Sequence, residues 1–96
     1  MNLLTLVKMR CGIPESITAY DEPEIKPLIK DCMIDMQSSG LPVSILPESV
    51  EDENPDPRVV TAISLYVLAH HGQDRSDTDL YMKMYRKKIF KLSLES

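Results

Sequence analysis

The side chains best suited to metal chemistry in this chain are two histidines and two cysteines. His70 and His71 are adjacent, and neighbouring positions on a helix project about 100° apart, so the two imidazoles cannot readily hold one ion. Cys11 and Cys32 fit none of the short-spaced zinc motifs. The sequence therefore predicts no metal site, two free thiols, and a partly buried His70 at the end of an apolar helix face.

The remaining candidates for catalysis are equally weak. Asp31 and Asp35 lie one helical turn apart on the side facing away from an apolar stripe, where a solvated face explains them better than an acid–base pair. No serine or cysteine lies in a nucleophile elbow, and no glycine-rich loop could hold a phosphate. We expect neither an enzyme nor a bound cofactor.

Charge is the more informative property. The net charge of -4 argues against a general nucleic-acid binder, but the charges are strongly segregated. One acidic group, here called the acidic cluster, comprises Glu48, Glu51, Asp52, Glu53 and Asp56. A basic group near the C-terminus, the basic cluster, comprises Lys83, Arg86, Lys87, Lys88 and Lys91. Opposite patches on one chain suit a head-to-tail contact between copies, and such contacts close into rings when the rotation permits.

Length and composition indicate one soluble globular domain over residues 1–96. The chain is 43% apolar and 27% charged, and it has one Phe and no Trp, so its core should be aliphatic. No apolar run approaches the roughly 20 residues of a membrane span. The N-terminus lacks the features of a signal peptide, so we expect an intracellular protein when it is synthesised.

The elements that position these residues are all predicted to be helical. A short helix over residues 3–11 is capped by Asn2, and a second opens at Asp21, where Glu24 completes the spacing of a capping box. Pro27 lies awkwardly in the second helix, so either its first turn is kinked or the regular helix starts later. A proline-containing acidic loop follows over residues 41–56, and a last helix carries the basic cluster on one side. Glycines at positions 12, 40 and 72 should end helices.

The helix following Asp56 and Pro57 is apolar nearly all round, so it must be covered nearly all round. We expect one face to form the core, and we expect Leu65 and Leu68 on the second face to contact another molecule or the 41–54 loop. The predicted core residues are Val59, Ile63, Tyr66, Val67, Ile25, Leu28, Ile29, Cys32, Leu80 and Met84.

The order of these pieces resembles the small head-tail connector (adaptor) proteins of long-tailed double-stranded DNA bacteriophages and prophages. The resemblance rests on Leu6-Val7-Lys8, on Tyr20-Asp21-Glu22, on Asp56-Pro57 with the run from Ala62 to Val67, and on spaced Tyr81 and Tyr85. It implies an all-α subunit of a ring, commonly of twelve copies, that docks beneath the portal in the virion after assembly in the bacterial cytoplasm. Its partners would be other copies of itself, the portal protein, and the next head-completion or tail protein. DNA would pass through the channel without sequence-specific binding, and no membrane would be involved.

Two other readings stay open. A small DNA-binding or regulatory protein would use the basic C-terminal helix, and a helical adaptor would bind a partner helix beside Leu65 and Leu68. In the connector reading, the basic cluster lies away from the DNA channel, because many phosphate contacts would hold DNA that must slide. Glu48, Glu51, Asp52 and Glu53 would then face the channel or the opposite neighbour.

Overall fold

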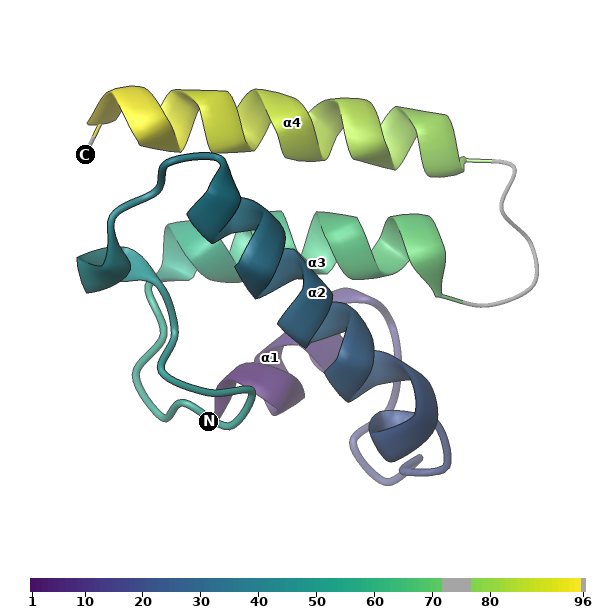
Figure 1. Cartoon of the computed structure of the whole chain (residues 1–96). Coiled ribbons are helices and arrows are strands. Elements are labelled where there is room, and N and C mark those ends of the chain that lie inside the picture. The colour runs from purple at the N-terminus through teal and green to yellow at the C-terminus, as the bar shows by residue number, and fades with distance from the viewer. Residues whose placement is uncertain (72–76, 96) are drawn as a thin grey trace.

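The computed structural model describes residues 1–71 and 77–95, and all regular structure in that part of the chain is helical (Figure 1). The elements are α1 (Leu3–Arg10), η1 (Asp21–Ile25), α2 (Lys26–Ser38), η2 (Val43–Ile45), α3 (Pro57–His70) and α4 (Thr78–Glu95). The predicted all-α fold, with three main helices, a short leading helix and a long proline-containing loop, is confirmed.

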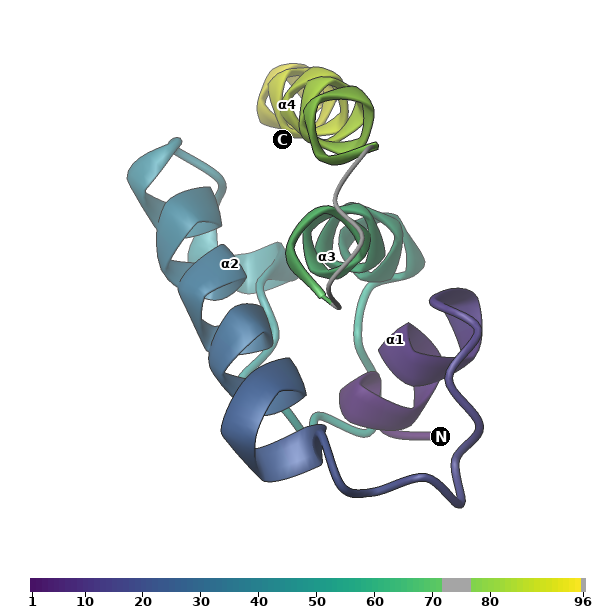
Figure 2. The ribbon, with the colours of Figure 1, turned by 90° about the vertical axis from the view of Figure 1, so that its right-hand side faces the viewer.

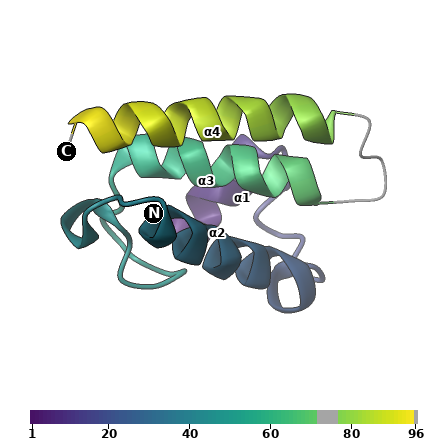
Figure 3. The same cartoon turned by 45° about the horizontal axis from the view of Figure 1, so that its top comes forward.

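Helix α3 is the centre of the molecule and contacts each of the other α-helices. Figure 2 shows α1 and α2 on opposite sides of α3, and α4 runs antiparallel to α3 along its length (Figure 3). The chain itself therefore buries most of this apolar helix, including the small residues Ala62, Ser64 and Ala69, which allow neighbours to approach. Leu65 and Leu68 are left half-buried.

The start of α3 follows directly from its sequence. The Asp56 carboxylate accepts a hydrogen bond of 2.9 Å from the Arg58 amide, and Pro57 occupies the first helical position. The helix ends at His70, and the predicted closing glycine at position 72 lies outside the described residues. Gly12 and Gly40 do follow helix ends, with left-handed φ values of 74° and 90°.

The second helix begins later than the capping-box pattern predicts. Residues Asp21–Ile25 form a wide π turn, and regular α-helix starts at Lys26, so Pro27 falls in the first turn, where a missing amide costs little. The predicted capping role of Asp21 is wrong, because no side chain caps this turn. The Asp21 carboxylate instead meets Lys8 on α1.

The predicted core is largely correct on α2 and α3 and wrong on α4. Val59, Ile63, Val67, Ile25, Ile29 and Cys32 are all inaccessible to solvent. Leu80 and Met84, which were expected in the core, are 55% and 45% exposed. Tyr85, Ile89 and Leu92 take their place, because α4 is rotated so that the i, i+4, i+7 set starting at Tyr85 faces α3.

The 41–56 loop packs against the start of α1. The amides of Leu3 and Leu4 donate to the carbonyls of Asp52 (2.8 Å) and Val50 (2.9 Å). Amides in the first turn of a helix have no hydrogen-bond acceptor within the helix, so the loop supplies one for each. Leu41 and Val50 are buried, so the loop is anchored at both the backbone and the side-chain level. Its acidic residues therefore occupy fixed places on the surface.

Candidate functional site

The structure brings part of the basic cluster together with Leu65. An apolar groove of about 330 Å³ runs between α3 and α4, here called the α3–α4 groove, and is lined by Leu65, Met84, Lys87, Lys88 and Lys91. Leu65 and Met84 are its apolar lining residues, and the other three lining residues are lysines. Leu68 follows Leu65 on the same stripe of α3 but does not line the groove. Lysine stems can cover apolar surface while their ammonium groups stay in water, so this groove suits an occupant with both apolar and acidic groups.

The basic cluster does not form the single face that the sequence predicted. Arg86 points to the opposite flank of α4, where it lines a hollow of about 210 Å³ with Asp35, Tyr85 and Phe90. Lys83 is exposed on the outside of the helix. None of the ion pairs within residues 1–71 and 77–95 involves any of the five cations of the basic cluster. Their charge is therefore not matched by an ion pair inside the described structure.

The acidic cluster divides into structural and exposed members. Asp52 accepts hydrogen bonds from the amides of Glu48 (3.0 Å) and Asn54 (2.8 Å), which lower its pKa. The Arg58 guanidinium beside Asp56 lowers the pKa of that carboxyl as well. These two groups shape the loop and the start of α3.

The other acids of the cluster lie further out. Glu51 lies 3.6 Å from the Lys26 ammonium on α2, and Glu48 and Glu53 are exposed to solvent. Glu48 and Glu53, two of the predicted interaction residues, are thus on the surface and take part in no ion pair within the described residues.

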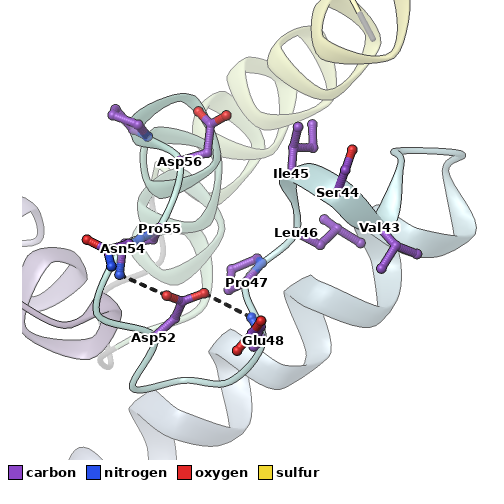
Figure 4. A pocket seen from close by; sticks show the side chains of 11 residues that line it. Val43, Ser44, Ile45, Leu46, Pro47, Glu48, Asp52, Asn54, Pro55 and Asp56 are labelled. Atoms are coloured by element: carbon purple, nitrogen blue, oxygen red, sulfur yellow. Dashed lines mark hydrogen bonds between the residues drawn. The ribbon is translucent and has the colours of Figure 1, made fainter.

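A second and larger cavity, the loop pocket, lies within the 41–56 loop beside the start of α3 (Figure 4). Its volume is about 750 Å³. The lining residues are Val43, Ser44, Ile45, Leu46, Pro47, Glu48, Asp52, Asn54, Pro55, Asp56 and Pro57. Figure 4 shows apolar side chains on the Val43–Pro47 part of the loop. The Asp52 carboxylate lies across from it and accepts hydrogen bonds from the amides of Glu48 and Asn54, so it links the two sides of the loop. The pocket therefore has a mostly polar, negatively charged lining with a smaller apolar part.

The histidines are held by ordinary structural contacts. His70 Nδ1 lies 2.9 Å from the Tyr66 carbonyl oxygen and its ring lies against the Tyr66 ring, which confirms its predicted partly buried position. His71 Nδ1 lies 2.9 Å from Glu24 and links the end of α3 to η1. Among the described residues, no group of three or more possible ligands could hold a metal ion.

The cysteines are free, as predicted. Burial raises the pKa of Cys11 to about 11 and that of Cys32 to about 12. Burial also raises the pKa of Tyr85, whose hydroxyl donates to Asp35 at 2.7 Å. Groups with raised pKa values stay protonated at neutral pH, so neither thiol is an activated nucleophile.

One buried charge was not predicted from the sequence. Lys8 is 2% exposed, and its ammonium donates to the carbonyls of Glu15 (3.2 Å) and Ile17 (2.8 Å). It also lies 3.0 Å from one carboxylate oxygen of Asp21. This cluster fastens the 11–20 segment between α1 and η1, and the helical pattern of α1 contains no signal that would distinguish Lys8 from a solvated lysine.

A family model described as a phage connector protein matches residues 3–96. Searches of curated proteins and of solved structures gave no match. Within the described part of the chain, no helix is both long and apolar enough to cross a bilayer.

Proposed function

We propose that this chain, which belongs to the phage connector protein family, is a ring-forming subunit that docks beneath the portal and joins the DNA-filled head to the tail or to the next head-completion protein. Family membership supports a structural role in the virion with partners among head and tail proteins. We infer a structural role with no catalysis and no cofactor.

The observation that carries the ring is the placement of unlike charges on different elements. Three lysines of α4 line an apolar groove, whereas Glu48 and Glu53 are exposed on a loop attached to α1 and α3. Surfaces of opposite charge on one subunit fit heterologous contacts, in which each copy presents one surface to each neighbour. Exposed single ion pairs contribute under about 1 kcal/mol, so a cluster is needed to steer docking.

The position of the basic cluster relative to DNA is also proposed. A channel lined by five cations would retain DNA through phosphate contacts, so these side chains face a neighbouring subunit or the portal. Glu48, Glu51, Asp52 and Glu53 face the channel or the opposite neighbour. In this arrangement DNA passes the ring without sequence-specific binding.

The test reverses charge at Lys87 and Lys88. The Lys87→Glu/Lys88→Glu variant should fail to assemble onto portal-bearing heads, and a Lys87→Arg/Lys88→Arg control, which keeps the charge, should assemble. Duplex DNA binding is measured in parallel at several salt concentrations. Normal assembly of the charge-reversed variant together with lost DNA binding would overturn the connector role of this patch.

That result would favour a small DNA-binding or regulatory protein instead. The observation in favour of this second candidate is the set of cations on α4 that make no ion pair within the described residues. Its signature would be duplex affinity that falls steeply with salt.

A further inference from the structure

Helix α4 carries an exposed stripe whose composition changes along its length. Lys83, Lys87, Phe90 and Leu94 follow one another at i, i+4, i+7 and i+11, and so lie on one line of the helix, here called the outer stripe. Phe90 is 66% exposed and Leu94 is 71% exposed, although Phe90 is the one phenylalanine of the chain. Phe90 and Leu94 are four residues apart, which is a spacing of apolar anchors on helices that bind in a groove.

The loop pocket has the complementary composition. Its apolar walls include Val43, Leu46 and Pro55, and its acids are Glu48, Asp52 and Asp56. Because hydrogen bonds and Arg58 lower the pKa values of Asp52 and Asp56, both carboxylates stay ionised at neutral pH. The volume of about 750 Å³ lies within the roughly 300–1,000 Å³ of pockets that enclose whole ligands, so it can accept several side chains.

We propose that the outer stripe of one copy binds in the loop pocket of a second copy, with Phe90 and Leu94 against the apolar walls and Lys83 and Lys87 beside the carboxylates. This contact rests on the proposed ring-forming function and specifies the two surfaces that join its subunits. Each chain carries one stripe and one pocket on different elements, so in a ring every copy can engage two neighbours through heterologous contacts. Buried aromatic anchors contribute most of the binding energy in many protein interfaces, and Phe90 is the anchor here.

The first experiment places a photo-crosslinking residue, p-benzoylphenylalanine, at position 90 of the full chain. Irradiation is carried out on the chain at concentrations where it self-associates and on the chain bound to portal-bearing heads, and the products are mapped by mass spectrometry. Cross-links to residues 43–57 of a second copy would support the contact. Cross-links elsewhere on a second copy, or only to the portal protein, would overturn it and leave a connector function standing. Failure of the unmodified chain to assemble in either setting would overturn the proposed ring and this contact together.

The second experiment tests the energetics with matched variants. Phe90→Ala should raise the dissociation constant of self-association about tenfold or more, as for an interface hot spot, and should leave the melting temperature unchanged because the side chain is mostly exposed. Met9→Ala, an exposed apolar residue on α1, is the control and should leave both unchanged.

A charge exchange tests which groups meet. Lys87→Glu should weaken self-association, and adding Glu48→Lys in the same chain should restore it, because each interface then regains opposite charges. Equal self-association of Phe90→Ala and the unmodified chain, or no recovery in the exchanged variant, would contradict the contact.

Discussion

At the scale of single residues, the most consequential side chain is Lys8, a charged residue that the fold buries. Its ammonium satisfies two loop carbonyls and one carboxylate, so it replaces the backbone hydrogen bonds that the irregular 11–20 segment lacks. Removing one partner of a buried ion pair leaves the other uncompensated, which costs more than the pair itself contributes.

We therefore expect Lys8→Met to lower the free energy of unfolding by about 3–5 kcal/mol, measured by chemical denaturation. The double variant Lys8→Met/Asp21→Leu should recover part of this loss, since the uncompensated carboxylate is gone. A loss of under about 1 kcal/mol for Lys8→Met would show that the pair behaves as an exposed one.

The buried thiol of Cys32 makes a prediction about alkaline stability. Its pKa of about 12 in the folded chain lies above the ordinary value of 9.0. The unfolded chain therefore loses this proton first, so the stabilising contribution is complete below pH 9 and declines as the pH rises toward 12. Cys32→Ala should lose less stability than the unmodified chain between about pH 9 and pH 12.

Denaturant midpoints at several pH values measure this difference. Met36→Ala, which truncates a neighbouring buried side chain on α2 without removing a titrating group, is the control and should keep the full alkaline decline. Parallel pH profiles for Cys32→Ala and the unmodified chain would contradict the prediction.

At the scale of elements, the sequence was most reliable where local chemistry sets the geometry. Asn2 and Asp56 cap their helices as expected, because a side-chain oxygen next to unbonded amides has one dominant use. Asp21 shows the limit of this reasoning, since a tertiary contact with Lys8 replaces its capping role.

The rotation of α4 could not be predicted because its apolar residues are spread around the helix. Leu80, Met84, Phe90 and Leu94 are exposed, whereas Tyr85, Ile89 and Leu92 are buried, and both sets have helical spacing. Only packing against α3 distinguishes them. Because both sets have helical spacing, the sequence alone did not identify the outer stripe and led us to expect the basic cluster on a single face of α4.

Two truncations test which face of α4 and α3 forms the core. Ile63→Ala should lower the free energy of unfolding by about 2–5 kcal/mol, as for other fully buried large-to-small changes. Leu80→Ala, at a mostly exposed position, should change it by less than about 0.5 kcal/mol. Thermal or chemical denaturation measures both, and equal losses would mean that Leu80 belongs to the core after all.

At the scale of the whole molecule, a flat subunit measuring 35 × 31 × 17 Å covers its most apolar helix on all sides but one. The remaining side carries Leu65 and Leu68, half-buried beside the α3–α4 groove. Helix α3 needs less outside cover than its apolar composition predicts, because α1, α2 and α4 supply most of that cover. What is left is a narrow stripe flanked by lysines, which suits a protein contact better than a missing piece of core.

Leu65 and Leu68 form this uncovered side of α3. Leu65→Ser/Leu68→Ser should weaken assembly, measured by native mass spectrometry or light scattering, more than it lowers the melting temperature, because both side chains are only partly buried in the single chain. The control Met9→Ser/Ile17→Ser alters two other exposed apolar residues and should affect neither quantity. If assembly is unaltered while the melting temperature collapses, both leucines belong to the monomer core and the contact between subunits lies elsewhere. Combining Leu65→Ser/Leu68→Ser with Phe90→Ala then tests whether these residues belong to one contact surface or to two. Independent surfaces should give additive losses of assembly free energy, whereas a shared surface should give less than the sum.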